Sequence, residues 1–315
     1  MKPETQQRQE LLSVPLSSAG QRLDLYLVQS LDGVSRKAIK QALDGGRVFV
    51  DGRVARRASQ LLGGGEILRL TLSGLAAAGA LPEPKILLLD EALLALDKPA
   101  GMPSHPTGSG RLDALSWASR WLRESQGQGT EPILLHRLDA DTSGVLLLAR
   151  TAAANRSLAR LFADRQMSKS YLALVAGTPP AQFEVDNYLR AGKRGRTEMV
   201  HSGGQRAQTG FRTLGQGAGF ALVEARPKTG RTHQIRVHLA ESGYPLLGDG
   251  LYAGPETLPG MAGLVFRRHL LHARSLQFPH PSADRLVTLE ATVAEDFLPL
   301  IQRLPQVPAQ LKPIC

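Results

Sequence analysis

The apolar residues between positions 20 and 72 follow the spacing of a small helical module. Leucine and valine recur at helical intervals from Leu23 to Leu31. Ser35 then stands where the N-cap of a second helix belongs, and that helix is predicted over residues 36–43. The pattern therefore predicts two short consecutive helices at the start of this region.

A hairpin is predicted directly after these helices, over residues 48–54. Its turn, Asp51-Gly52, suits the positive φ angles of a type I′ turn. Basic residues surround the helix and the hairpin, so this α/β module offers a phosphate-contacting surface. A solvated charged face is the alternative interpretation. The candidate contacts are Arg36, Lys37, Lys40, Arg47 and Arg53.

A second apolar system is predicted over residues 86–303, after a linker at 73–85 that is rich in Ala, Gly and Pro. Several short strands are separated by few helices. This pattern favours the α+β class, with a mixed, largely antiparallel central sheet and peripheral helices. The helices are expected at 113–124, 155–165 and 232–242.

The most polar stretch of this system lies between two apolar runs. Ile133 to Leu135 leads into it and Val145 to Ala149 leads out, so residues 136–144 are predicted to form a tight turn between two strands. Strands on both sides would hold the turn rigidly. A rigid turn is well suited to holding a reactive carboxylate.

The composition of the chain excludes several classes of protein and of site. The chain has 315 residues, 42% of them hydrophobic, and no apolar run approaches the roughly 18 residues needed to cross a bilayer. Met1 to Glu10 lacks the apolar core of a signal peptide, so a cytoplasmic location is expected. Cys315 is the single cysteine, which excludes a disulfide within the chain and a thiolate zinc site.

The formal net charge of +10 is compatible with a polyanionic partner such as RNA or DNA. A basic surface without such a partner is the alternative. Aromatic residues make up only 5% of the chain, so recognition by charge and shape fits better than base stacking on an aromatic platform.

Three interpretations of the stretch Asp139 to Gly144 compete. A calcium loop would need a bidentate glutamate at the twelfth position, where Arg150 stands, so that interpretation fails. A structural turn capped by its own Asp and Thr side chains remains possible. The third interpretation is a catalytic carboxylate, Asp139, beside cationic partners.

A second polar cluster, Gly230 to His238, supports the catalytic interpretation. An arginine on a packed helix can pair with a carboxylate and keep it ionised. His233 and His238 are five residues apart, which does not match the i, i+4 spacing of a zinc helix. The chain also lacks a Walker lysine loop, a nucleophile elbow and a dinucleotide-binding fingerprint, so neither a metal nor a cofactor is expected.

The string His136-Arg137-Leu138-Asp139-x-x-Thr142-Ser143-Gly144 resembles the signature of the RluA family of pseudouridine synthases. The resemblance runs from about residue 86 to about residue 300. Asp97 and Ala253 are minor departures from the family pattern. Four further motifs match: Lys98-Pro99-x-Gly101 with His105, Lys169-x-Tyr171, Gly230-Arg231-Thr232-His233-Gln234-Ile235-Arg236, and Gly248-Asp249 to Tyr252.

The resemblance implies isomerisation of uridine to pseudouridine in RNA, without a metal or cofactor. It implies that Asp139 is the essential carboxylate and that Arg236 is its ion-pair partner. Tyr171 would pack under the base, and its hydroxyl could act in proton transfer. Arg137 would enter the RNA stack in place of the flipped nucleotide, because a stacked base cannot be reached or turned over. Further RNA contacts are expected from His136, Arg231 and His233.

The N-terminal module resembles the RNA-binding S-four domain. Its matching stretches include Gln21-Arg22-Leu23-Asp24 and Gly46-Arg47-Val48-Phe49-Val50. The module and the basic charge favour large-subunit ribosomal RNA as the target, with transfer RNA as the alternative. The family suggests a monomer, and no obligate protein partner is expected.

A non-catalytic RNA-binding or ribosome assembly factor is a second hypothesis. A glycosidase is a third, although nothing identifies Asp141 as its second carboxylate.

Overall fold

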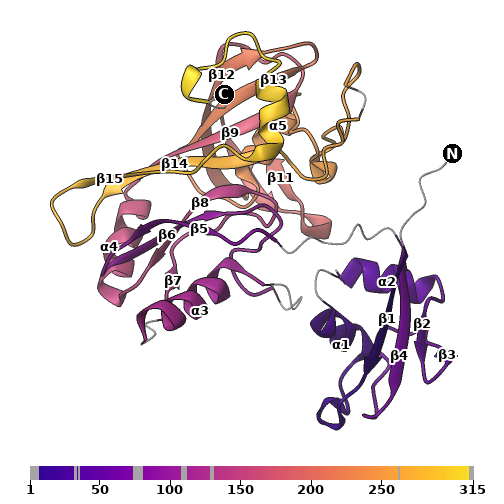
Figure 1. Cartoon of the computed structure of the whole chain (residues 1–315). Coiled ribbons are helices and arrows are strands. Elements are labelled where there is room, and N and C mark those ends of the chain that lie inside the picture. Colours follow the sequence, from indigo (N-terminus) through magenta and orange to yellow (C-terminus); the bar gives the residue numbers. More distant parts are fainter. Residues whose placement is uncertain are drawn as a thin grey trace. The chain divides into compact units, whose positions relative to one another are not determined.

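The computed structural model describes residues 7–31, 34, 36–73, 81–107, 112–127, 131–261 and 263–311. The chain divides into two compact units (Figure 1). The N-terminal unit contains residues 1–82 and 106–113, and the C-terminal unit contains the remainder. Most of the predicted linker, residues 74–80, lies outside the described residues, as does Cys315.

The N-terminal unit packs two helices against one face of a four-stranded antiparallel sheet (Figure 1). Leu27 and Ile39 from the helices meet Leu68 and Leu70 from the sheet in a buried core. The strand order is β1-β4-β2-β3. Its elements are β1 (Gln7–Ser13), η1 (Leu16–Ser18), α1 (Leu23–Ser30), α2 (Arg36–Asp44), β2 (Val48–Val50), β3 (Arg53–Val54) and β4 (Ile67–Ser73).

The predicted hairpin is confirmed, since Asp51 and Gly52 have φ angles of 47° and 77°. The sheet, however, begins before the predicted boundary at residue 20. Strand β1 is paired along its whole length with β4. Its sequence contains only two adjacent leucines, so its period gives little sign of a strand, and pairing with β4 decides its structure.

The C-terminal unit is built on an 11-stranded sheet, which confirms the predicted α+β class. Its main path runs β11-β10-β12-β13-β9-β14-β8-β6-β5, with β15 paired to β14 and β7 to β8. The strands are β5 (Lys85–Leu89), β6 (Leu93–Lys98), β7 (Ile133–Leu134), β8 (Ser143–Ala149), β9 (Ser168–Ala176), β10 (Gln182–Ala191), β11 (Thr197–Val200), β12 (Gln205–Gln216), β13 (Phe220–Pro227), β14 (Leu271–Pro279) and β15 (Leu286–Glu290).

Helices lie at the periphery of this sheet. Trp117 and Leu122 of α3 are buried, as an amphipathic helix requires. The predicted helix from 232 begins later, at Gln234, because His233 has a left-handed conformation with φ of 53°. The helical segments are α3 (Ala114–Gln126), α4 (Ala152–Ala163), α5 (Gln234–Glu241), α6 (Leu298–Ile301), η2 (Lys193–Gly195), η3 (Gly250–Tyr252), η4 (Glu295–Phe297) and η5 (Ala309–Leu311).

One parallel pair interrupts the otherwise antiparallel ladder, where β14 meets β8. In its register Ala273 lies opposite Gly144. A Cβ atom on Gly144 would lie 2.2 Å from the Ala273 carbonyl oxygen, and Gly144 also has a φ of 108°. Only glycine therefore allows β8 to leave the polar turn so close to β14.

Two sequence predictions about this unit need correction. The unit extends past the predicted limit at residue 303, because Leu304, Val307 and Leu311 are part of a buried core. The stretch from Arg190 to Arg196 lacks an apolar period, which predicts an exposed basic loop, but its first two residues belong to strand β10, where Arg190 pairs with Glu198 of β11. Hydrogen bonding to a neighbouring strand overrides the lack of an apolar period there. Within the described residues, every helix is too short or too polar to span a membrane.

Candidate active site

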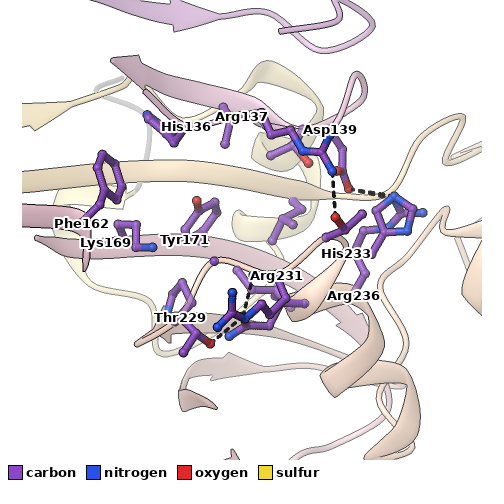
Figure 2. Close-up of a pocket in the computed structure, with 18 of the residues that line it drawn as sticks. His136, Arg137, Asp139, Phe162, Lys169, Tyr171, Thr229, Arg231, His233 and Arg236 are labelled. Atoms are coloured by element: carbon purple, nitrogen blue, oxygen red, sulfur yellow. Dashed lines mark hydrogen bonds and ion pairs between the residues drawn. The ribbon is translucent and has the colours of Figure 1, made fainter. Parts of the chain in front are cut away.

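The residues of the two polar clusters line a single pocket of about 430 Å³ in the C-terminal unit (Figure 2). The turn between β7 and β8 forms one side, and the segment leading into α5 forms the other. Strand β9 contributes Tyr171 and Lys169. Tertiary folding thus joins segments that lie roughly 100 residues apart in the chain: Asp139 and Arg236 are separated by 97 positions.

The turn that carries Asp139 is closed by a hydrogen bond from the Thr142 backbone N–H to the Asp139 carbonyl, at 3.0 Å. The Ala140 carbonyl accepts hydrogen bonds from the Gly101 N–H at 2.8 Å and from Lys98 Nζ at 3.0 Å. The loop after β6 therefore braces the turn directly.

Lys98 is fully buried, and burial lowers its pKa to about 7. Its Nζ also donates to the carbonyls of Pro99 and Met102, at 2.9 and 2.7 Å. Three acceptors match the three N–H groups of an ammonium, so this side chain ties the loop to the turn. Ser104 adds a second connection, because its hydroxyl donates to the Leu138 carbonyl and accepts from the Leu138 N–H.

The turn is also held from the side of β14. Arg268 Nη1 donates to the Asp141 carbonyl at 2.8 Å. The Thr142 hydroxyl lies 2.8 Å from His269 Nε2, and the Ser143 hydroxyl lies 2.9 Å from His272 Nδ1. Burial lowers the pKa of each histidine to about 3, so both rings are neutral near pH 7. The two histidine contacts therefore restrain the turn without adding charge beside Asp139.

Arg236 connects two carboxylates. Its Nη1 donates to Asp139 Oδ2 at 2.8 Å, while Nε and Nη2 donate to both oxygens of Asp249 at 2.7 and 2.8 Å. The Arg236 side chain is 8% exposed and that of Asp249 is 1% exposed. Burial alone would lower the pKa of Arg236, but its hydrogen bonds and ion pairs, first with Asp249 and then with Asp139, raise it. The guanidinium stays charged and is aimed at Asp139.

His233 completes this end of the pocket. Its Nε2 lies 3.8 Å from Asp139 Oδ2, and its Nδ1 lies 2.9 Å from the Tyr252 hydroxyl. Burial is the main cause that lowers the pKa of His233, so its ring is neutral near pH 7. Tyr252 also lies under the Arg236 guanidinium, 5.1 Å from ring centroid to Cζ. The segment after α5 therefore supports both residues that face Asp139.

Tyr171 lies on β9, between Ala225 of β13 and Ala273 of β14. Neighbours on both sides fix the strand, and the side chain enters the pocket. Burial, followed by the charge of Asp139, raises the pKa of the phenol above its ordinary value. The hydroxyl is therefore protonated at neutral pH.

Comparison with known proteins matches residues 92–241 to the family model described as RNA pseudouridylate synthase, and residues 21–68 to the S4 domain. A Xanthomonas campestris protein named "Ribosomal large subunit pseudouridine synthase D" is 34% identical over 302 residues, 92% of this chain and 91% of its own. The chain belongs to the RluA family of RNA pseudouridine synthases.

Other relatives agree with this assignment. A Nitrosomonas europaea protein of the same name is 36% identical over 311 residues, covering 94% of this chain and 88% of its own. The solved structure titled "Human RNA Pseudouridylate Synthase Domain Containing 4" is 28% identical, with a TM-score of 0.60, and covers 71% of this chain and 94% of its own. As a member of the family, the chain is an isomerase that converts uridine to pseudouridine in RNA.

Among the predicted RNA contacts of this pseudouridine synthase, Arg137 is exposed at the turn. Its Nη2 donates to the Thr232 hydroxyl at 2.8 Å, which joins the two sides of the pocket (Figure 2). Arg231 is also exposed, and its Nε donates to the Arg206 carbonyl at 3.2 Å. Both guanidiniums are accessible to a polyanion.

His136 is held differently. Its Nε2 accepts a hydrogen bond from the Leu147 N–H at 3.0 Å, and its ring packs against Phe162 with centroids 5.5 Å apart. Burial lowers its pKa to about 3, so the ring is neutral. A direct RNA contact by His136 stays a prediction, and the contacts seen here support the pocket wall.

The remaining predicted RNA contacts lie in the N-terminal unit. Lys40 and Arg53 are exposed. Arg47 is half-buried, and its Nη2 donates to the Gln41 carbonyl at 3.2 Å. The side chains of Arg36 and Lys37 lie outside the described residues.

Several residues of this synthase site had no role predicted from sequence: Lys98, Lys169, Asp249, Tyr252 and Arg268. The first four stand in stretches that match the family. The match indicated that they lie near the site, but it did not indicate what each side chain contacts. Their partners are distant in sequence, so only folding reveals the contacts. Asp249, for example, needs a turn that returns to α5 before it can meet Arg236.

Proposed function

We propose that this synthase isomerises uridines in large-subunit ribosomal RNA. The observation that carries the proposal is the pocket in which Asp139 and Arg236 are paired, within a chain that aligns along 92% of its length with a relative named for the large ribosomal subunit. The S4 domain and the net charge of +10 support an RNA of this kind. The proposed location is the cytoplasm, and the proposed state is a monomer without an obligate protein partner.

In the proposed reaction Asp139 acts as the ionised carboxylate at the ribose. The bond between N1 and C1′ breaks, the uracil rotates, and a bond forms between C5 and C1′. A proton leaves C5 and another joins N1, so the reaction is an isomerisation that needs no metal or cofactor. Arg236 orients Asp139, because its guanidinium donates to one carboxylate oxygen at 2.8 Å.

The proposed roles of the exposed residues follow from their position at the pocket. Extrusion of a uridine from a helix costs roughly a few kcal/mol and leaves a gap in the stack. Arg137 lies exposed beside Asp139 and would fill that gap, with Arg231, His233 and His136 along the pocket. In the N-terminal unit, Arg36, Lys37, Lys40, Arg47 and Arg53 are proposed to contact phosphates.

Pseudouridine mapping of total RNA tests the proposed target. In a strain that lacks this protein, we expect discrete pseudouridines to disappear from large-subunit ribosomal RNA. They should return when the wild-type gene is supplied. Loss confined to transfer RNA would overturn the proposed target, and an unchanged map would contradict a non-redundant role in either RNA.

Substitution of Tyr171 by phenylalanine tests the role of the hydroxyl. Tyr171→Phe keeps the ring under the base but removes a protonated phenol from the pocket, so the single-turnover rate should fall about 100-fold, within the range for general acid–base groups. RNA affinity should change little, because the ring surface is unaltered. An unchanged rate would show that the hydroxyl is dispensable and that the ring alone contributes.

A further inference from the structure

The pocket has a second end, away from Asp139, that is formed by Lys169, Phe162 and His136 (Figure 2). Lys169 precedes Tyr171 by two positions on β9, so the two side chains emerge from the same face of the strand. Figure 2 shows Tyr171 between this end and the group formed by Asp139, His233 and Arg236. A base that packs on Tyr171 therefore extends toward Lys169.

The ammonium of Lys169 is half-buried, and within the described part of the chain it has no carboxylate partner. Its Nζ lies over the Phe162 ring, 5.7 Å from the ring centroid. Burial lowers the pKa of this lysine. By contrast, Arg236 is paired with two carboxylates and Lys98 with three carbonyls. An unpaired ammonium in a partly desolvated pocket is costly unless a ligand supplies acceptors.

Two other residues, His136 and Gly230, line this end of the pocket. His136 already accepts a hydrogen bond from Leu147 through Nε2. Gly230 faces Lys169 without a side chain, and even a Cβ atom there would stay 3.8 Å from Nζ. Lys169 and Gly230 both line the pocket, so an oxygen of a bound ligand can approach the ammonium from there.

An ammonium is a donor only, so the ligand atom must be an acceptor. Uracil has carbonyl oxygens at C2 and C4, on either side of N3. Rotation by half a turn about the axis through N3 and C6 exchanges N1 with C5 and the C2 carbonyl with the C4 carbonyl. One donor can therefore bind a carbonyl both before and after the base turns over. Cytosine has a donating amino group at C4 and breaks this symmetry.

We propose that Lys169 is a specificity-determining residue, whose Nζ donates to the C4 carbonyl of the bound uridine and to the C2 carbonyl after the base turns over, and so selects uridine over cytidine. This inference rests on the synthase activity and the active-site pocket of the proposed function. It does not depend on which RNA is the target. A phosphate oxygen is the other acceptor that an ammonium could take. The exposed cations Arg137 and Arg231 are better placed for phosphates than this half-buried group.

The test is Lys169→Met in the full-length protein, with Lys228→Met as a matched control. Methionine keeps the apolar stem beside Phe162 but removes the donor. Lys228 lines the same pocket, but it is exposed and pairs with Glu184 at 2.9 Å. The substrate is a synthetic RNA hairpin that carries the mapped uridine. The competitor is the same hairpin with cytidine at that position.

For Lys169→Met we expect KM for the uridine hairpin to rise by about 10- to 100-fold, as for loss of one charged hydrogen bond. The inhibition constant of the cytidine hairpin should stay the same or fall. The kcat value should change less than KM, because the contact exists on both sides of the rotation. Lys228→Met should leave the ratio of the two constants unchanged.

Three outcomes would overturn the proposal. If both constants rise together and the slope of log affinity against log salt falls by about one, Lys169 contacts a phosphate. If neither constant changes, Lys169 does not touch the RNA. If Lys228→Met has the same effect on the ratio, the selection is not specific to Lys169. Failure of the proposed function would be seen separately, because the wild-type protein would then form no pseudouridine in the uridine hairpin.

Discussion

Asp139→Asn is expected to abolish pseudouridine formation, with a fall in rate of about 10⁴-fold or more, the scale seen when an essential reacting group is removed. The amide keeps the size of the side chain and still accepts a hydrogen bond from Arg236, so the pocket should retain its shape. It removes the negative charge that the reaction needs at the ribose. The charge of Arg236 stays compensated by Asp249, which limits the effect on folding.

Rates should be measured under single-turnover conditions, together with the affinity for the same RNA. The affinity of Asp139→Asn should stay within a few-fold of the wild type. Asp141→Asn is the matched control, because Asp141 is an exposed carboxylate of the same turn and should tolerate the change. Turnover by Asp139→Asn within tenfold of the wild type would refute the role of Asp139.

Arg236→Met should also cause a large loss of activity, about 100-fold or more, because Asp139 loses the guanidinium that orients it. It should lower the free energy of unfolding by about 3–5 kcal/mol as well. Asp249 would remain buried, with 1% of its side chain exposed, and would lose its bidentate partner. Urea unfolding and single-turnover rates measure the two effects separately.

A double substitution tests whether Arg236 acts by orienting Asp139 or only by stabilising the fold. In Arg236→Met with Asp249→Asn, the buried unpaired charge is gone, so much of the lost stability should return. The activity should not return, since nothing replaces the guanidinium beside Asp139. Recovery of activity along with stability would show that Arg236 acts only through the fold. The two sites are in direct contact, so their effects are not expected to add.

Local features were the most predictable from the amino-acid order. The strand–turn–strand reading of residues 133–149 is confirmed by β7 and β8, which pair across the turn. The type I′ hairpin at Asp51-Gly52 needed only residues with access to positive φ. Both depend on interactions among near neighbours in the chain, which sequence patterns report directly.

Features that depend on distant partners were less predictable. Strand β1 was missed because its pairing with β4 joins residues about 60 positions apart. The loop predicted from Arg190 to Arg196 was placed two residues too early, since the hydrogen bonds of Arg190 and Ala191 to β11 leave no trace in an apolar period. The carboxyl-terminal limit was placed too early because the core contacts of Leu311 come from tertiary packing.

The sequence by itself determined which side chains are available for chemistry: a carboxylate, a phenol and a guanidinium in strings that resemble one family. Only the tertiary structure decided how they meet. It placed Arg236 between Asp139 and Asp249 and brought Gly144 against Ala273. Among the residues that the structure describes, it left Lys169 without a carboxylate partner. The physical reason is that side-chain identity is local, whereas burial, ion pairing and protonation depend on neighbours that folding brings together from distant parts of the chain.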